Sequence, residues 1–285
     1  MSHYTGVKVV QTSKAVIDAL YSEGQVSIDY FDGAGPFYPN MFLVLKNEES
    51  NSALAIVDKT RDMIVPLQKN LQASGIKPKN KEQAMALHAL MDDSIPLHIM
   101  TGRAGTGKTL LSIAAAMQKI EEKKYDKIII TRPMSQVGRY DLGALPGDIS
   151  EKVNPYLLNY MTNIEQIVGK KAVQDALEQY CIEVIPMQLI RGASFTKAFI
   201  IADEVQVLDF HEMLTLGTRV GEGSKIVVMG DLDQRDEKIT KEKTGIWKIQ
   251  EDEKMKGSKL VSSIELLKVE RSELAKLFAE VFESK

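Results

Sequence analysis

The chain of 285 residues divides into two stretches that differ in the pattern of apolar and polar positions. From residue 76 onward, short continuous apolar runs alternate with longer segments in which apolar residues recur at helical spacing. Continuous runs are typical of strands buried on both faces, as in a parallel sheet that helices cover. The predicted strands are PLHIMT (96–101), KIIIT (127–131), IEVIP (182–186), AFIIAD (198–203) and KIVVMGD (225–231). The predicted helices span 108–124, 150–168, 171–180 and 209–220.

Residues 1–75 have another pattern, in which one helical segment is followed by short runs separated by turn-rich sequence. SKAVIDALYSEG predicts a helix that Ser13 caps and Gly24 ends. The later runs predict strands near 25–30, 41–46, 52–58 and 62–67. We therefore expect a small β-rich accessory domain over residues 1–75, without catalytic residues, and an α/β domain over residues 76–285.

Composition restricts the function classes. The formal net charge is -3 and the pI about 5.9, so any nucleic-acid site must be a local groove rather than a basic surface. Cys181 is the one cysteine in the sequence, which excludes an internal disulfide framework and fits a cytoplasmic setting. The N-terminus has no signal-peptide pattern, and the apolar runs are too short to span a bilayer, so we expect no membrane association. The mixed charge run at 236–259 predicts a solvated segment.

The motif GRAGTGKT (102–109) follows the first predicted strand and opens a predicted helix, which is the context of a phosphate-binding P-loop. Glycines let the backbone N–H groups wrap a phosphate, Lys108 neutralises the β and γ oxygens, and the Thr109 hydroxyl holds Mg²⁺. The predicted nucleotide-binding residues are Gly102, Arg103, Ala104, Gly105, Thr106, Gly107, Lys108, Thr109 and Leu110.

Two further strand ends carry candidate catalytic residues. AFIIADE places Asp203 at the carboxyl end of a buried strand, where it would bind Mg²⁺ through water, and Glu204 would polarise the attacking water. An adjacent glutamate favours hydrolysis over transfer to a bound acceptor. GDLDQ follows the next strand, and Asp231 and Gln234 are candidate sensors of the γ-phosphate.

The segment NKEQ (80–83) resembles the guanine-reading N-K-x-D sequence, but it ends in glutamine and lies upstream of the P-loop. A glutamine side chain bonds both donor and acceptor edges of a base, so Gln83 is a candidate adenine reader. This favours ATP over GTP.

Several segments in order resemble the PhoH family of ATPases, which are relatives of the superfamily 1 helicases. They include KPKNKEQAMALH, GRAGTGKT, TRPMSQVGRYDLGALPGDISEKVNPYL, PMQLIRGASFTKAFIIADEVQ, GDLDQRD and VERSELAKLFAEVF. The resemblance covers about residue 76 to the C-terminus and implies a RecA-like P-loop core with a mostly parallel sheet. Arg103 and the sequence DEVQ depart from the more usual residues, yet they leave Asp203, Glu204 and Gln206 in place.

Residues 1–75 resemble the region that precedes the ATPase in longer PhoH proteins, which begin with a PIN ribonuclease domain. The chain shows no cluster of PIN-type acidic residues, so nuclease activity is not expected of it.

The resemblance also implies contact with nucleic acid, because Thr131, Arg132 and Pro133 correspond to a helicase segment that touches its backbone. Arg132 at a strand end suits bidentate binding of phosphate, and Arg139 and Tyr140 are candidates for phosphate contact and base stacking. The alternatives are that Arg132 has a structural role or serves ATP in a neighbouring subunit.

About fifty residues follow Asp236, too few for a second lobe of typical domain size. A catalytic arginine raises the rate of hydrolysis by a factor of about 10³–10⁵. Either Arg271 folds back onto its own site, or a neighbour supplies an arginine such as Arg191, which requires a ring or another head-to-tail assembly. The resemblance to PhoH proteins implies a hexamer.

The sequence therefore predicts a Mg²⁺-dependent ATPase that couples hydrolysis to translocation on, or unwinding of, RNA or single-stranded DNA. Two alternatives remain open at this point. One is an ATP-gated assembly or binding module without helicase activity, and the other is a small-molecule kinase.

Overall fold

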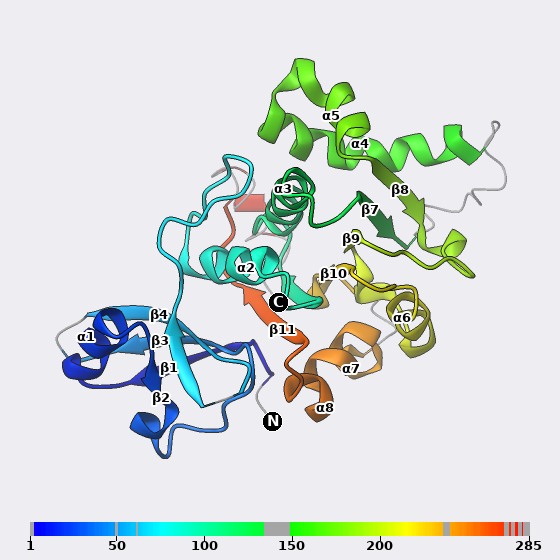
Figure 1. The fold of residues 1–285 in the computed structure, drawn as a ribbon. Helices are drawn as coiled ribbons and strands as arrows, with labels where there is room; N and C mark the ends of the chain where they lie inside the picture. The colour runs from blue at the N-terminus through cyan, green and yellow to red at the C-terminus, as the bar shows by residue number, and fades with distance from the viewer. Residues whose placement is uncertain are drawn as a thin grey trace.

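The structure is a computed structural model of the chain, and it describes residues 3–48, 51–60, 62–133, 149–235 and 240–270, with positions 274, 277, 278 and 281 beyond them. Two sheets form the framework (Figure 1). A five-stranded sheet belongs to the N-terminal stretch, and a six-stranded sheet belongs to the rest. The α/β class with a parallel central sheet and a β-rich N-terminal region is thus confirmed.

The N-terminal sheet has the strand order β1-β3-β4-β5-β2, in which β1 and β3 are parallel and the other neighbours are antiparallel. Its elements are β1 (Val7–Gln11), α1 (Lys14–Ser22), β2 (Val26–Ser27), β3 (Phe42–Lys46), β4 (Ser52–Val57) and β5 (Met63–Pro66). Ser13 caps α1 by accepting from the Val16 N–H, as the sequence predicts. The sequence analysis missed β1, and only Val26 and Ser27 of the strand expected at 25–30 are extended, because a 3₁₀ turn follows them.

The main sheet has the order β11-β6-β10-β9-β7-β8, and each of these neighbours pairs in parallel. Its strands are β6 (Leu97–Gly102), β7 (Lys127–Arg132), β8 (Ile182–Pro186), β9 (Ala198–Ala202), β10 (Lys225–Gly230) and β11 (Val261–Leu266). The five predicted strands are present within a residue or two of their expected bounds. The sequence analysis missed β11, at the edge of the sheet.

Helices cover both faces of this sheet (Figure 1). One face carries α2 (Lys81–Met91), α3 (Lys108–Glu121), α4 (Ile149–Val168) and α5 (Val173–Gln179). The other carries α6 (Phe210–Gly217), α7 (Gly245–Glu251) and the short α8 (Glu253–Lys256). Helix α7 falls inside the charge run expected to be solvated, yet Ile246 and Gln250 are buried, so that expectation is wrong for α7.

A buried lysine fixes the position of α2 against the sheet. The Lys225 ammonium group is fully buried and donates to the carbonyl oxygens of Ala89, Asp92 and Ile95 at 2.7–2.8 Å. A cation at the carboxyl end of a helix satisfies carbonyls that have no partner within the helix and complements its dipole. Lys225 therefore ties the end of α2 to the start of β10.

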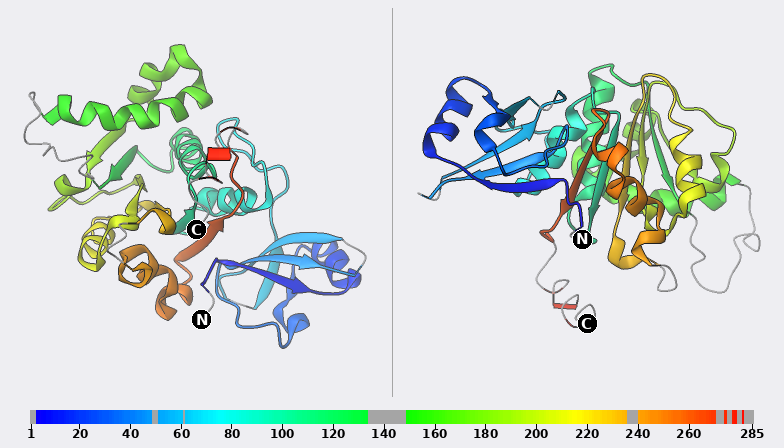
Figure 2. Two further views of the ribbon diagram at one scale, coloured as in Figure 1. Left: turned by 180° about the vertical axis from the view of Figure 1, so that it is seen from behind. Right: turned by 90° about the horizontal axis from the view of Figure 1, so that it is seen from below.

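The N-terminal sheet joins the main sheet along β11, and Figure 2 shows the two lying side by side. The Glu265 N–H donates to the Thr5 carbonyl, and the Asn40 amide donates to the carbonyls of Lys259 and Val261. Gly6 lies so close to β11 that a Cβ built on it would be 1.8 Å from the Ser263 carbonyl oxygen. The backbone of residues 5–6 thus packs directly on the edge strand.

Replacing Gly6 with alanine is expected to lower the free energy of unfolding by more than about 1 kcal/mol, because the φ of +75° disfavours a side chain and the added methyl meets backbone. Urea denaturation measures the change. Gly33→Ala is the matched control, since Gly33 has φ +79° but no atom within 4 Å of its built Cβ. Equal effects of the two substitutions would show that the contact with β11 contributes nothing.

Candidate functional site

The register of the parallel strands brings the predicted site residues to one edge of the sheet. Gly230 on β10 pairs with Thr101 on β6, and Ala202 on β9 pairs with both Val228 and Thr131. The loops that follow β6, β9 and β10 therefore leave the sheet at the same level, which is where ligands bind in open parallel sheets.

The P-loop connects β6 to α3 with a conformation that glycine permits. Gly105 and Gly107 have φ of +82° and +94°, and Gly107 is the N-cap residue of α3. The Thr106 hydroxyl donates to the Arg103 carbonyl at 2.9 Å and closes the turn. The Lys108 ammonium donates to the carbonyls of Gly102 and Arg103 at 2.6 and 3.1 Å. Lysine and helix N-terminus thus face the same concave loop, the arrangement that binds phosphate.

Thr109 and Asp203 meet across the site. The Thr109 hydroxyl lies 3.4 Å from a carboxylate oxygen of Asp203, at the start of α3 and the end of β9 respectively. Burial raises the pKa of Asp203, and the neighbouring Glu204 raises it further, while the positive charges of Lys108 and Arg132 oppose the shift. A hydroxyl and a carboxylate oxygen side by side are ligands that suit Mg²⁺, which takes few protein ligands and keeps waters and phosphate oxygens. Among the described residues no group of three or more His, Cys, Asp and Glu side chains could hold another metal.

Glu204 has a left-handed backbone conformation, with φ +56°, immediately after β9. Its N–H donates to the Asp203 carboxylate at 3.0 Å, and its own carboxylate accepts from the Gln206 amide at 2.7 Å. Non-glycine residues with positive φ are costly, and they cluster at functional sites. The turn places Glu204 beside Asp203, which is the position that a water-polarising residue needs.

Gln206 connects two strand ends. Its amide donates to Glu204, and its carbonyl oxygen accepts from the Asp231 N–H at 3.2 Å. The side chain is buried, and a Cβ on Gly230 would be 2.8 Å from its oxygen, so β10 approaches it closely. The sequence analysis noted Gln206 only as part of the DEVQ motif and gave it no role.

The loop after β10 contributes Asp231, which lies close to the P-loop. Its carboxylate accepts from the Asp233 N–H, and burial raises its pKa while Lys108 and an Ala104 backbone bond oppose the shift. Gln234 ends the following 3₁₀ turn and is exposed. The structure thus brings Asp231 to the P-loop and leaves the Gln234 side chain at the surface.

Gln83 is buried beside the P-loop, at the start of α2. Its oxygen accepts from the Lys79 N–H at 2.8 Å, and its amide donates to the Thr106 carbonyl at 2.9 Å. Both ends of the side chain are therefore bonded to protein in this structure, and its role as an adenine reader stays a prediction.

The residues predicted to touch nucleic acid have unlike environments. Thr131 and Pro133 are buried, whereas Arg132 is half-buried at the end of β7. Arg132 lies beside Asp203 and beside Tyr160 of α4, which is buried. Burial raises the pKa of Tyr160 and the charge of Asp203 raises it further, while the positive charge of Arg132 opposes the rise. The sequence analysis missed Tyr160, and no pattern in α4 separates it from a core residue.

Three predicted residues lie outside the described part of the chain, namely Arg139, Tyr140 and Arg271. Arg191 is exposed, beyond β8 at the far edge of the sheet. Strands lie about 4.8 Å apart, so β8 is about 19 Å from β6 in this sheet order. No helix among the described residues is long and apolar enough to cross a membrane.

A glycine-rich loop between a parallel strand and a helix, with a lysine, a threonine and an aspartate from a second strand, defines a P-loop nucleotide-binding core. The profile of the PhoH family, described as PhoH-like protein, matches residues 75–283. The chain is 39% identical to Protein PhoH2 of Bacillus subtilis over 98% of its length and 64% of the relative. It is 30% identical to Protein PhoH2 of Mycolicibacterium smegmatis over 99% of its length and 63% of the relative. The chain therefore belongs to the PhoH-like family, and it spans less than two thirds of these two relatives.

Among solved structures, the SWI2/SNF2 ATPase core of Sulfolobus solfataricus in complex with dsDNA matches with a TM-score of 0.39 at 13% identity, covering 59% of this chain and 35% of that one.

Replacing Gln206 with alanine is expected to lower kcat for ATP hydrolysis by about tenfold or more, because Glu204 loses its bond to the β10 side of the site and its position shifts. Steady-state kinetics and a separate nucleotide-binding titration measure the effect, and the dissociation constant for nucleotide is expected to stay within about twofold. Gln179→Ala, at an exposed position on α5, is the matched control. An unchanged kcat would show that Gln206 has no role in hydrolysis.

Proposed function

We propose that this chain is a Mg²⁺-dependent ATPase that couples hydrolysis to movement along, or unwinding of, RNA or single-stranded DNA as an oligomeric ring. The observation that carries the ATPase part is the contact between Thr109 and Asp203, with Glu204 bonded beside them and Lys108 facing the same loop. Membership of the PhoH-like family supports the same conclusion.

Each residue of the site has its own role in hydrolysis. The P-loop N–H groups and Lys108 bind the phosphates, and Lys108 exchanges its bonds to the loop carbonyls for bonds to phosphate oxygens. Thr109 and Asp203 would hold Mg²⁺, which would supply neutralisation of the phosphate charge. Glu204 orients and deprotonates the attacking water, and Gln206 holds the Glu204 carboxylate in place. Asp231 lies where loss of the γ-phosphate changes its surroundings, since it lies close to Lys108.

Coupling to nucleic acid is supported by the position of Arg132. It ends β7 beside Asp203, so a change at the nucleotide reaches it directly. We place the phosphate-backbone contact at Arg132, and such contacts carry no sequence preference. The ring is supported by Arg191, which is exposed after β8, four strands from β6 in the sheet, and would complete a neighbour's site.

Lys108→Ala is expected to abolish ATP turnover, and Glu204→Gln is expected to retain ATP while slowing hydrolysis by about 10²–10⁴-fold, because a positioned general base contributes about that much. Phosphate release and nucleotide retention on the isolated protein measure the two effects. Lys170→Ala and Glu178→Gln, both at exposed positions, are the matched controls. Normal turnover in either site variant contradicts the site assignment.

RNA or single-stranded DNA is expected to raise the ATPase rate, and duplex DNA to raise it less, each tested separately. With Arg132→Gln, the same stimulation is expected to require at least about tenfold more nucleic acid. The dependence of nucleic-acid binding on salt concentration should also become shallower, because one phosphate contact is lost. Glu204→Gln, which is expected to retain ATP and hydrolyse it slowly, serves as the reference for binding without turnover. ATPase activity that responds to no nucleic acid would favour an ATP-gated assembly module, and phosphate found on an acceptor would favour a kinase.

A further inference from the structure

The side chain of Tyr160, on α4, ends in a buried hydroxyl that has no hydrogen-bond partner among the described residues. The residue is 1% exposed and packs in the core beneath α2, α3, α4 and α5. Taking a hydroxyl out of water without giving it a new hydrogen bond is unfavourable. A buried hydroxyl of this kind therefore requires a physical reason for its presence.

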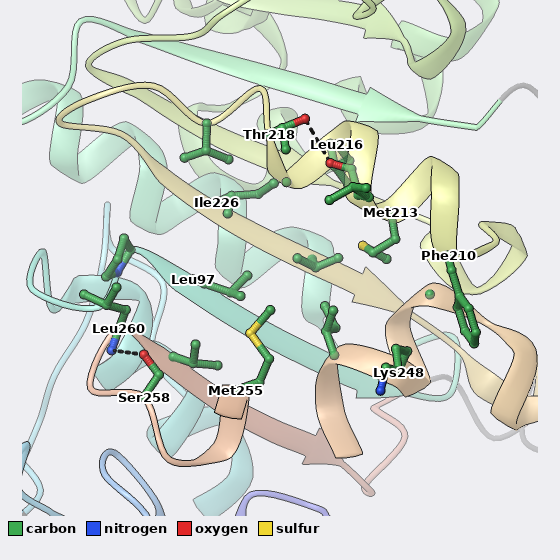
Figure 3. A pocket seen from close by; sticks show the side chains of 18 residues that line it. Leu97, Phe210, Met213, Leu216, Thr218, Ile226, Lys248, Met255, Ser258 and Leu260 are labelled. Atoms are coloured by element: carbon green, nitrogen blue, oxygen red, sulfur yellow. Dashed lines mark hydrogen bonds between the residues drawn. The ribbon is translucent and has the colours of Figure 1, made fainter. Parts of the chain in front are cut away.

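A tyrosine elsewhere in the same core shows the usual arrangement. Tyr180 is also buried, and its hydroxyl donates to the Glu121 carboxylate at 2.6 Å. On the opposite face of the sheet, where an open apolar groove lies (Figure 3), the Thr218 hydroxyl donates to the Leu214 carbonyl at 3.0 Å. A phenylalanine would fill the space of the Tyr160 ring equally well, so the hydroxyl is not explained by packing.

The alternation of side chains along the strands brings two charged residues to the face that α4 covers. On β7, Ile130 packs in the same core as Tyr160, so Arg132 leaves the chain on that face two residues later. On β9, Ile201 packs in this core, and Asp203 follows it by two residues. The Asp203 N–H donates to a β7 carbonyl at 2.9 Å and so extends the pairing of the two strands. Tyr160 thus lies close enough to both charged groups for them to act on its hydroxyl.

The Asp203 carboxylate has room for a further donor. One of its oxygens accepts from the Glu204 N–H at 3.0 Å, and the other lies 3.4 Å from the Thr109 hydroxyl. A carboxylate accepts about four hydrogen bonds through its two oxygens. Its terminal torsion is broad, so it can turn without a change in the backbone. Carboxylates that ligate a metal are in turn held by hydrogen bonds from neighbouring groups.

We propose that Tyr160 is a positioning residue of the nucleotide site, whose hydroxyl donates to the Asp203 carboxylate and fixes it as a ligand of nucleotide-bound Mg²⁺. Tyr160 contacts neither the nucleotide nor the metal and acts through Asp203. In the chain alone the unbonded hydroxyl lowers stability, as residues kept for activity often do. The inference rests on the proposed function, because that function supplies the Mg²⁺ and the ATP.

The test compares Tyr160→Phe with Tyr180→Phe in the full chain. Each substitution removes one buried oxygen and keeps the ring, but the Tyr180 hydroxyl is already bonded to Glu121. In EDTA without nucleotide, Tyr160→Phe is expected to unfold at the wild-type temperature or above it. Tyr180→Phe is expected to unfold at a lower temperature, because it leaves an acceptor without its donor. Circular dichroism follows the unfolding.

Mg²⁺ is then titrated in the presence of AMP-PNP, an ATP analogue that is not hydrolysed, and the rise in unfolding temperature is measured. Tyr160→Phe is expected to need at least about tenfold more Mg²⁺ for half of the rise, since residues that hold metal ligands have effects of about 10–100-fold. At a fixed Mg²⁺ concentration its kcat for ATP hydrolysis is expected to fall about tenfold or more. Binding of AMP-PNP in EDTA is expected to stay within about twofold, because the P-loop binds the phosphates without Tyr160. Tyr180→Phe is expected to match the wild type in these three measurements.

Three results would each overturn the inference. Unfolding of Tyr160→Phe at a lower temperature would show that its hydroxyl is already bonded in the chain alone. A wild-type Mg²⁺ requirement, or a wild-type kcat, would show that Asp203 does not depend on Tyr160. An unaltered Tyr160→Phe beside a wild-type chain that hydrolyses ATP would reject this role and leave the proposed function standing. A wild-type chain that binds Mg²⁺ and AMP-PNP but does not hydrolyse ATP, together with a raised Mg²⁺ requirement in Tyr160→Phe, would do the reverse.

Discussion

The parallel register of β6, β10 and β9 is the constraint on which the site depends. Because Gly230 pairs with Thr101 and Val228 pairs with Ala202, three loops from distant parts of the sequence leave the sheet together. The lysine and threonine of one loop then meet the carboxylates of the others without any long connecting structure. In a strand, a shift by one residue turns every side chain to the other face. Such a shift in β9 would turn Asp203 away from Thr109, whereas the apolar residues of β9 would stay buried because both of its faces are covered, so the chemistry depends on the register more strictly than burial does.

The main sheet could be predicted from the sequence because its inner strands are buried on both faces and have to be apolar throughout. β1 and β11 do not follow this rule. In β11, Ser262 and Ser263 are buried although they are polar, because the strand lies between β6 and the N-terminal segment. The run VKVVQ of β1 is too short and too mixed to stand out, and its pairing with β3 exists only after β3 has formed. Burial created by contacts between distant segments leaves no local pattern.

The candidate site divides in the same way. The P-loop and the acidic strand end are local sequence patterns, so Lys108, Thr109, Asp203 and Glu204 could be predicted. The bridge through Gln206 could not, since it depends on how closely β10 approaches the turn after β9. At the charge run of 236–259 the error has the opposite sense, because the sequence predicted a solvated segment where the structure has buried residues. Its lysines and glutamates hide two apolar positions from a reading by composition, since Ile246 of α7 is buried in the core and Met255 of α8 packs against the same core.

The segment that follows β11 and the nucleotide site share one hydrogen bond. The Glu270 N–H donates to the Gly105 carbonyl in the middle of the P-loop, and the Glu270 carboxylate accepts from Asn80 at the N-cap of α2. The segment that follows β11 is therefore tied both to the loop that binds phosphate and to the start of α2. The edge strand that the sequence analysis missed thus leads directly to a residue that holds the nucleotide-binding loop in place.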